Sequence, residues 1–503
     1  MMQTPELFWA MGLLLPLFMG AVLAYVVGKI ISRTRGDRAG GLAAAAITLA
    51  AAAGVYILTL VYPHISTGGA AAAVDWLGVL EPDALSLFMV KVIFPLIILV
   101  AIYSIDYMKE DLGTDKYYAL LLIMTGGMVG VAGAGDIVSL YVFFEILSIS
   151  SYCLVSFRKQ SWEPIEAGFK YVITNALGST LAILGLGLLY LFSGKLSMAE
   201  IAAQVSGWPD LPVMAALVLV ITGFGVKAAM VPLHFWLPDA HSAAPSGISA
   251  LLSGIVIQVG FFAMLRLVLT VFAVQLQMVG LILIVFAAIT MTYGNYIALA
   301  QSDIKRMLAY SSVAQMGYII LGFGVGFYYQ SVNGITGGLF HIETHAFMKA
   351  LAFLSAGYII ERAGTRRMAE LKGAGRAMPL AGAAFAVAAL GLAGIPAFSG
   401  FMSKLMIYKS GFQAGTALGV VLSSVAIANS IISLGYYLPA IHTLFSPGDA
   451  AALKQKGAAS PAAAVILPVA AMALITLVLG WYPELGLGPV NPAVAEIFKV
   501  IGG

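Results

Sequence analysis

The sequence contains little charge. Only 10% of its 503 residues are Asp, Glu, Lys or Arg, while 61% are hydrophobic. A soluble globular chain usually has about 25% charged residues, so this chain lacks the polar side chains that a water-facing surface would need. The composition excludes a soluble enzyme, a nucleic-acid-binding protein and a disordered scaffold. It predicts an all-α protein that crosses a membrane many times.

Cysteine is almost absent. Cys153 is the only one in the sequence, which excludes an intrachain disulfide and an iron–sulfur cluster, because a cluster needs several thiolates. We therefore expect no cofactor and no redox or catalytic centre in this chain. Any enzymatic role would be that of a subunit of a translocase. The net charge of +3 is too small to indicate a polyanionic partner such as nucleic acid.

Long apolar runs dominate the remaining sequence. A helix needs about 20 apolar residues to cross the hydrocarbon core, and fourteen such runs are present. They span residues 5–28, 41–62, 82–103, 117–134, 137–157, 170–192, 213–231, 246–271, 277–299, 307–327, 335–360, 378–408, 415–440 and 461–481. The first is too long for the core of a signal peptide and has no cleavage pattern, so we interpret it as a retained helix.

The basic residues predict the orientation in the membrane. If the loop that carries Lys29 to Arg38 is cytoplasmic, seventeen Lys and Arg residues lie in inner loops and only Lys195, Lys409 and Lys499 lie outside. This asymmetry follows the positive-inside rule. The inner loops include Lys454 and Lys456 near the C-terminus. We expect a multi-pass protein of the inner (cytoplasmic) membrane with both termini on the outer side.

Two of the runs contain helix-breaking residues beside a lysine. The sequence around Lys227 reads GFGVKAAMVPLHFWLPDAH, and GLAGIPAFSGFMSK ends at Lys404. Broken helices with a charge at membrane depth, in corresponding places of two halves, are typical of an ion pathway. The pattern predicts two inverted five-helix repeats with discontinuous helices seven and twelve. The expected parts are residues 1–116, 117–272, 273–440 and 441–503: a three-helix segment, two repeats, and a final helix with its tail.

Several ionisable residues within the runs are candidates for moving charge. Glu145 lies in the middle of helix five, where an unpaired carboxylate is costly. We interpret it as the partner of Lys227, with a structural carboxyl as the alternative. His341, His345 and Lys349 share one face of helix eleven because they are four residues apart.

The two histidines allow three interpretations. They form part of a proton relay, they bond to another helix as core residues, or they bind a metal, although no third ligand is evident. Glu343 turns to another face, and no role follows for it from the sequence. His234 and His241 flank the first break and are candidates either for gating water entry or for interfacial caps. Pro232 and Pro396, inside the two breaks, are further gating candidates.

Other polar residues have structural explanations. Asp83 and Asp136 stand at predicted helix starts and are expected to be N-caps. Lys170 and Arg266 lie near helix ends, where we expect a long side chain to reach the interface. Lys91 lies deep in helix three, and the sequence names no partner for it.

Five ordered segments resemble a known family. They read SLYVFFEILSISSY, GFGVKAAMVPLHFWLPDAHSAAPSGISALLSG, QSDIKRMLAYSSVAQMGY, HIETHAFMKALAFL and GIPAFSGFMSKL. They are similar to the antiporter-like subunits of Mrp-type cation/proton antiporters, respiratory complex I and membrane-bound hydrogenases, with an Mrp D-type or hydrogenase subunit as the expected equivalent. The resemblance is dense over residues 80–410. It implies a fourteen-helix core, two inverted repeats and buried charges along the membrane midplane.

The resemblance also assigns residues and shows one departure. The family's glutamate falls on Glu145 and its lysines on Lys227 and Lys404, and the helix-eleven histidines fall on His341 and His345. Many relatives have a lysine in helix eight, where LLSGIVIQVG here has Gln258. Because an amide cannot hold a proton near neutral pH, the link from Lys227 to the second repeat would run through water at Gln258, reach His341 directly, or be broken.

The leading hypothesis is a proton-translocating subunit of a larger membrane complex, with sodium as a second candidate ion. Its partners would be other membrane subunits, protons and lipids, and a partner redox module or an opposing cation gradient would drive it. A self-sufficient secondary cation transporter and a structural membrane-arm subunit with an inactive pathway are the alternatives. The sequence does not distinguish an antiporter from a hydrogenase or a quinone reductase.

Overall fold

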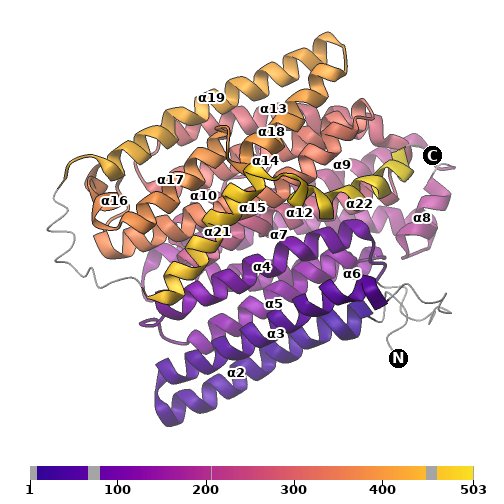
Figure 1. Ribbon diagram of the computed structural model, residues 1–503. Coiled ribbons are helices and arrows are strands. Elements are labelled where there is room, and N and C mark those ends of the chain that lie inside the picture. The colour runs from indigo at the N-terminus through magenta and orange to yellow at the C-terminus, as the bar shows by residue number, and fades with distance from the viewer. Residues whose placement is uncertain (1–7, 66–79, 206, 449–461, 502–503) are drawn as a thin grey trace. The chain divides into compact units, whose positions relative to one another are not determined.

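The computed structural model describes residues 8–65, 80–205, 207–448 and 462–501 (Figure 1). Every regular element within these ranges is a helix, as the composition predicts. Lys454 and Lys456 lie outside the described residues. The chain divides into two compact units, each of which is described by itself. Unit 1 comprises Met1–Ala228, Val256–Leu276 and Ala495–Gly503, and unit 2 comprises Ala229–Ile255 and Gln277–Val494.

Unit 1 is built from long helices, many of which carry exposed apolar residues on one face. Its elements are η1 (Phe8–Leu14), α2 (Leu15–Arg35), α3 (Asp37–Ile65), α4 (Ala84–Tyr107), α5 (Thr114–Gly133), α6 (Ile137–Val155), α7 (Trp162–Ser193), α8 (Met198–Val205), α9 (Asp210–Lys227), α12 (Ile257–Thr270) and η4 (Ala273–Gln275). Helices α2 and α3 lie side by side. Large exposed side chains such as Leu177 and Leu191 on α7 indicate lipid contact.

Unit 2 contains the remaining helices. They are α10 (Trp236–Ala243), α11 (Ser246–Leu251), η3 (Leu252–Val256, at the boundary), α13 (Leu276–Leu299), α14 (Ile304–Tyr328), α15 (Val332–Ala363), η5 (Met368–Leu371), α16 (Ala374–Ala377), α17 (Pro379–Ala393), α18 (Ser399–Gln413), α19 (Ala417–Phe445), α21 (Ala463–Trp481) and most of α22 (Glu484–Ile501). Helices α14 and α15 are almost entirely buried. Most polar residues of these two helices therefore lie inside protein.

Each of the fourteen predicted ranges contains helix. By length and composition, twelve helices of the described residues could cross a membrane, or thirteen if Met368–Ala377 and Pro379–Ala393, bent by 117°, count as one span. Helices α15 and α18 are outside this count. The all-helical multi-pass fold is confirmed, and the number fourteen stays a prediction.

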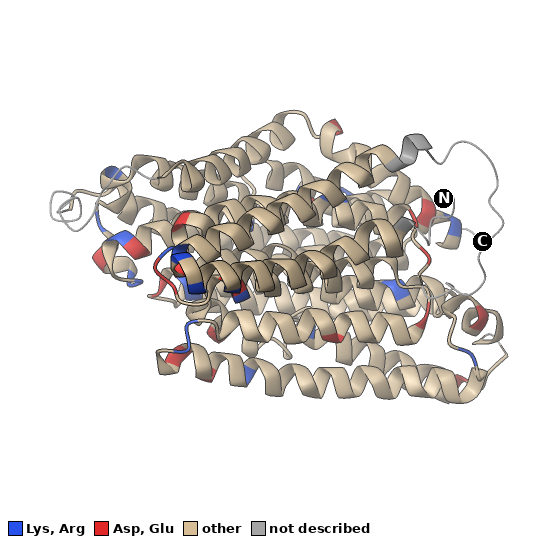
Figure 2. Ribbon diagram, turned by 90° about the horizontal axis from the view of Figure 1, so that it is seen from below, with Lys and Arg blue, Asp and Glu red and all other residues tan. Residues whose placement is uncertain are grey.

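Side-chain caps begin several helices where the sequence places an aspartate. The Asp136 carboxylate accepts from the backbone N–H groups of Val138 and Ser139, and Asp83 caps α4 with Ser86 in a capping box. Both predicted N-caps are confirmed. Such caps satisfy N–H groups that a helix start leaves without partners. Figure 2 shows that most charged segments gather near helix ends and that the long helices are mainly uncharged.

The two predicted interruptions are present. Helix α9 ends at Lys227, and helical structure resumes only at Trp236, where α10 begins. Helix α17 ends at Ala393 and α18 begins at Ser399. Gly394, directly after α17, has φ +83°, a conformation that favours glycine. Both interruptions free backbone groups next to a lysine.

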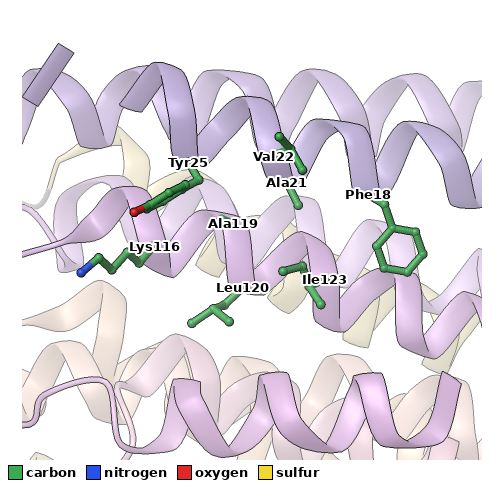
Figure 3. Close-up of a pocket in the computed structure, with 8 residues that line it drawn as sticks. All are labelled: Phe18, Ala21, Val22, Tyr25, Lys116, Ala119, Leu120 and Ile123. Carbon is green, nitrogen blue, oxygen red and sulfur yellow. The ribbon is translucent and has the colours of Figure 1, made fainter. Parts of the chain in front are cut away.

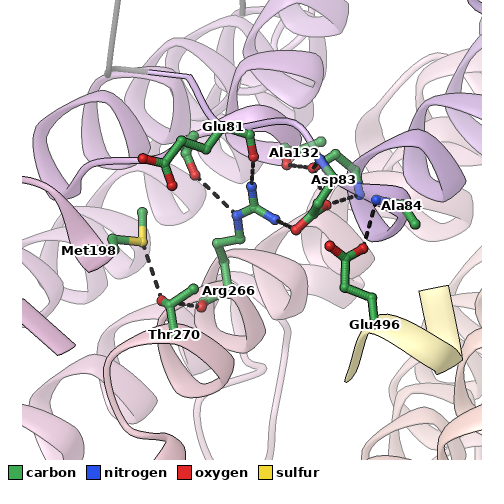
Figure 4. A network of polar contacts seen from close by, with 10 residues as sticks. Glu81, Asp83, Ala84, Ala132, Met198, Arg266, Thr270 and Glu496 are labelled. Atoms are coloured by element: carbon green, nitrogen blue, oxygen red, sulfur yellow. Dashed lines mark hydrogen bonds and ion pairs between the residues drawn. The ribbon is translucent and has the colours of Figure 1, made fainter. Parts of the chain in front are cut away.

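Arg266 corrects a prediction. Its side chain is only 4% exposed instead of reaching the interface. Figure 4 shows its guanidinium bound to the Asp83 carboxylate and to the backbone carbonyl of Glu81. Its Nε also donates to the Ala134 carbonyl at 3.1 Å. Glu496 joins the same region, since its carboxylate accepts from the Ala84 N–H at 2.7 Å. Lys170 does lie at the surface, where it pairs with Glu166 at 2.9 Å.

Replacing Arg266 with alanine should strongly destabilise the protein. The change leaves the Asp83 carboxylate without its cationic partner, although Ser86 still donates to it, and it removes a donor from two carbonyls. Breaking a buried ion pair costs about 3–5 kcal/mol. The measurement is thermal unfolding of the purified protein in detergent. Arg367→Ala is the control, because this residue pairs with Glu370 at an exposed site, where the expected loss is about 1 kcal/mol or less. Equal losses would contradict the assigned importance of the buried network.

Candidate functional site

The first candidate cluster lies in unit 1 around Lys227, at the C-terminal end of α9. The side chain is fully buried. Its ammonium nitrogen donates to the Tyr171 hydroxyl at 2.8 Å and to the Ser151 hydroxyl at 3.2 Å. It also lies 4.7 Å from the Tyr171 ring centroid and 5.1 Å from that of Tyr152. The break thus presents Lys227 to hydroxyl groups and aromatic faces, which stabilise a cation.

Glu145 belongs to the same cluster. Its carboxylate accepts a hydrogen bond from Ser179 on α7, and its charge acts electrostatically on Lys227. The side chain is partly exposed, between Val142 and Ile149 on the exposed face of α6. The pathway role of the Glu145–Lys227 pair stays a prediction, although the electrostatic coupling supports it.

A glycine of α12 makes room for Lys227. A Cβ atom at Gly260 would lie 2.7 Å from the Lys227 Cγ atom and 2.8 Å from its Cβ atom. Any larger residue would therefore displace the lysine. Gln258 lies two residues earlier on the same helix and is fully buried, so the departure from the resembling family is located inside unit 1.

The second candidate cluster lies in unit 2 around Lys404 on α18. The lysine is 1% exposed. Its ammonium nitrogen donates to the Leu392 carbonyl at 2.8 Å and to the Ser430 hydroxyl at 3.1 Å, and it lies 4.2 Å from the Tyr318 ring centroid. Leu392 is in the last turn of α17, where the interruption leaves carbonyls without intrahelical donors. The break itself therefore provides an acceptor for Lys404.

His341 extends this cluster through two hydrogen bonds. Its Nδ1 lies 2.8 Å from the Ser403 hydroxyl and its Nε2 lies 3.0 Å from Gln315 Oε1. The Gln315 amide nitrogen donates to the Leu392 carbonyl at 2.8 Å. Because a carbonyl only accepts, the amide orientation is fixed and Oε1 must accept from His341. A neutral His341 therefore carries its proton on Nε2, and Nδ1 accepts from Ser403.

The other predicted residues of helix eleven lie nearby on α15. His345 is fully buried, with its ring centroid 6.0 Å from that of His341. Lys349 is also fully buried and donates to the Leu308 carbonyl at 2.9 Å and to Ser311. Among the described residues, no three His, Cys, Asp or Glu side chains are grouped to hold a metal ion. Glu343 lies apart, and a Cβ at Gly486 would lie 2.9 Å from its Oε2.

The two gating histidines are buried in unit 2, whereas the two gating prolines, Pro232 and Pro396, are exposed. His241 is fully buried and stacks on Phe353 at 4.7 Å between ring centroids. His234 is 1% exposed and contacts Tyr293. The histidine side chains do not cap α10, whose Ncap is Phe235. Pro232 and Pro396 stand in the interruptions, and their gating roles stay predictions.

Sequence reasoning missed the hydroxyl groups that surround both lysines. Tyr171, Ser151 and Ser430 read as ordinary polar residues of apolar helices, and only the fold brings them to a lysine. One signal was present: Tyr171 and Ser179 are eight residues apart on α7 and share a face. The sequence does not show that both residues bond to α6, through Ser151 and Glu145.

Comparisons with known proteins agree with this geometry. Residues 134–430 match the family described as NADH:quinone oxidoreductase/Mrp antiporter, transmembrane part, and residues 79–118 match the N-terminus of chain 5 of NADH-ubiquinone oxidoreductase (complex I). F420H2 dehydrogenase subunit N of Methanosarcina mazei is 35% identical over 80% of this chain and 82% of its own length. NADH-quinone oxidoreductase subunit N of Desulforudis audaxviator is 33% identical, with 81% and 82% covered.

Solved structures show the same fold. A chain of the archaeal membrane-bound sulfane sulfur reductase is 28% identical, with a TM-score of 0.83 and 98% of this chain and 99% of that chain covered. A chain of the Mrp complex from a Dietzia species is 26% identical, with a TM-score of 0.81 and coverage of 99% and 100%. The family match, the identities and the buried lysines at two helix interruptions agree: the chain belongs to the NADH:quinone oxidoreductase/Mrp antiporter family of membrane proteins.

Proposed function

We propose that this chain moves protons across the membrane as one subunit of a larger complex. The observation that carries the proposal is a buried lysine at a helix interruption in each unit, Lys227 and Lys404. A buried amine that only stabilised the fold would need no helix break beside it. Ionisable groups at membrane depth are costly, and ion pathways are where membrane proteins retain them.

The first cluster contains a short hydrogen-bonded path of two hydroxyls, which ends at a backbone carbonyl that cannot carry a proton onward. The Lys227 ammonium donates to Tyr171, the hydroxyls of Tyr171 and Ser151 lie 3.0 Å apart, and Ser151 donates to the Ser148 carbonyl. Hydroxyl groups donate and accept, so this path remains bonded whether Lys227 is charged or neutral. We propose that protons enter unit 1 here, and that Glu145 and Lys227 take part in the exchange.

The second cluster has a branched path. The Ser430 hydroxyl lies 3.1 Å from the Lys404 ammonium, 3.0 Å from the Tyr318 hydroxyl and 2.6 Å from the Tyr408 hydroxyl. In the proposed route, protons pass from Lys227 by way of water bound to Gln258, reach His341 and His345, and leave near Lys404. Lys349 supplies a further protonatable group on the helix that carries the histidines.

The driving force must come from other subunits. Moving one proton against 100 mV costs about 2.3 kcal/mol, and we propose no redox centre or cofactor in this chain. The names of the F420H2 dehydrogenase and quinone oxidoreductase relatives support a redox module as the driver, and the Mrp relative supports an opposing cation gradient. Sodium would need several oxygen ligands at one place, and only Glu145 and Glu343 are acidic deep within the predicted spans, so sodium is only the second candidate ion.

The predicted organisation is part of the proposal. We place both termini on the outer side of the cytoplasmic membrane, because the basic residues favour inner loops. We divide the chain into segments 1–116, 117–272, 273–440 and 441–503, with two inverted five-helix repeats in the middle. The interruptions beside Lys227 and Lys404 support this arrangement, since each would belong to one repeat.

The histidines provide the test. The intact complex carrying His341→Phe and His345→Phe, reconstituted in liposomes, should lose proton transport, because phenylalanine keeps the packing and removes every ring nitrogen. Transport is followed with a pH-sensitive dye during turnover of the complex. His442→Phe is the matched control, since His442 is exposed near the end of α19, where its ring contacts Ser446, and this variant should transport normally.

Each outcome of this experiment is informative. Wild-type transport by the double variant would favour a structural subunit with an inactive pathway, an interpretation that Gln258 motivates. The single chain should transport nothing in liposomes without its partner subunits. Transport by the chain alone would favour a self-sufficient cation transporter.

A further inference from the structure

A groove lies between α2 and α5 in unit 1, and no residue of the Lys227 cluster lines it. It has a volume of about 540 Å³ and is lined by Phe18, Ala21, Val22, Tyr25, Lys116, Ala119, Leu120 and Ile123. Figure 3 shows these side chains along the two helices, with Tyr25 and Lys116 together at one end and Phe18 at the other. The groove is thus apolar over most of its length and basic at one end.

Small residues create the hollow. Ala21 and Ala119 are buried and form its floor, because their side chains are too short to fill the space between the helices. Val22 on α2 is exposed and forms a wall. Phe18 closes the apolar end, since its ring packs on Gly126, where a Cβ would lie 2.8 Å from the ring. The shape is therefore built into the packing of the two helices.

Helical periodicity brings a second lysine to the basic end. Phe18, Val22, Tyr25 and Lys29 are separated by four, three and four residues on α2, so they share one face. Lys29 lies one turn beyond Tyr25, about 6 Å further along the helix. Lys116 stands at the corresponding end of the groove on α5. Within the described residues, neither lysine forms an ion pair.

We propose that this groove binds an anionic phospholipid, with one acyl chain between α2 and α5 and the phosphate between Lys29 and Lys116. The apolar part alone could not select a lipid, because hydrocarbon tails gain little by leaving other hydrocarbon. Selection comes from the two ammonium groups and the Tyr25 hydroxyl, which lie at the level where the apolar groove ends. A choline headgroup carries its own cation, which the lysines repel, so the groove favours phosphatidylglycerol over phosphatidylcholine.

The nearby acid does not oppose this assignment. Asp115 precedes Lys116 in the first turn of α5, but its side chain is 3% exposed and packs against Gly28, where a Cβ would lie 2.9 Å from the Asp115 Cβ. The carboxylate therefore belongs to the helix interface. The groove presents only cations and a hydroxyl at its polar end.

The test measures lipids retained by the intact complex. Wild type and variants are purified from nanodiscs that contain equal amounts of phosphatidylglycerol and phosphatidylcholine, and the bound lipids are counted by native mass spectrometry. Lys29→Gln with Lys116→Gln should lower the preference for phosphatidylglycerol at the site roughly 20- to 30-fold, since each lysine near a membrane surface contributes about a fivefold factor. Ala119→Leu, which fills the floor, should release both lipids.

The control variant removes two positive charges at positions that do not line the groove. Arg35 lies on another face of α2, and Lys159 lies in the loop after α6, so Arg35→Gln with Lys159→Gln should leave the preference unchanged. An equal fall in both pairs would show a general surface potential and overturn the site, as would retention of lipid by Ala119→Leu. A photo-crosslinker at Val22 should label lipid. Labelling of a neighbouring subunit instead would make the groove a protein interface.

Discussion

Replacing Lys227 with methionine should abolish proton transport and leave assembly of the complex intact. Methionine keeps the length and apolar volume of the side chain but removes the donor to Tyr171 and Ser151. The remaining hydroxyls can still bond to each other, so the fold has no reason to change. Loss of a positioned proton-transfer group typically costs about 10²-fold or more in rate. Dye-monitored proton uptake by liposomes that contain the complex measures the effect.

Matched variants separate charge from position. Lys170→Met removes a lysine of α7 that pairs with Glu166 at the surface, and it should transport like wild type. Glu145→Gln should reduce transport because it removes the charge that acts on Lys227, whereas Glu166→Gln should not. Full transport by both Lys227→Met and Glu145→Gln would contradict the proposed entry route.

Valine at Gly394 should also abolish transport, although this residue carries no functional group. A Cβ at Gly394 would lie 3.2 Å from the Lys404 Cδ atom and 3.7 Å from its Nζ atom, and 3.8 Å from the Ser430 hydroxyl. The added methyl groups would therefore displace the ammonium from Leu392 and Ser430. The same assay measures the effect, together with the melting temperature of the complex.

Gly364 provides the control for backbone strain. Its φ of +72° is close to the +83° of Gly394, and a Cβ there would meet no atom within 4 Å. Gly364→Val should therefore carry a similar conformational cost, about 1–2 kcal/mol or more, and still transport protons. If both variants lost transport equally, strain and not the contact with Lys404 would be responsible.

The sequence was sufficient to predict the helical class, the two interruptions and the costly residues. Four ionisable residues stand out in the apolar runs because such side chains are costly to bury in a membrane. They are Lys227, Lys404, His341 and His345. Arg266 shows where this reasoning fails. Its place near a helix end favoured an interfacial side chain, but its partner Asp83 lies 183 residues away in sequence, and only the fold brings the two together.

The residues that surround the two lysines could not be predicted from the sequence either. Serine and tyrosine occur throughout membrane helices, so their identity alone did not distinguish Ser151 and Tyr171 from residues that bond within their own helix. Gly260 was not predicted because glycine has no side chain that would mark it as functional. Its importance is steric, and it follows only from the close approach of α12 to Lys227.

The Leu392 carbonyl accepts hydrogen bonds from both Lys404 and Gln315, and this limits how a proton could pass through His341 on the proposed route. Because this oxygen holds the Gln315 amide in one orientation, the imidazole faces an oxygen that takes a hydrogen bond but does not take up the proton itself. A proton that arrives at Nδ1 from the Ser403 side therefore cannot leave at Nε2 while the amide stays in place. On the proposed route, a proton passes His341 only if the imidazole ring or the Gln315 amide turns. The Leu392 carbonyl, in the last turn of α17, holds that amide in place.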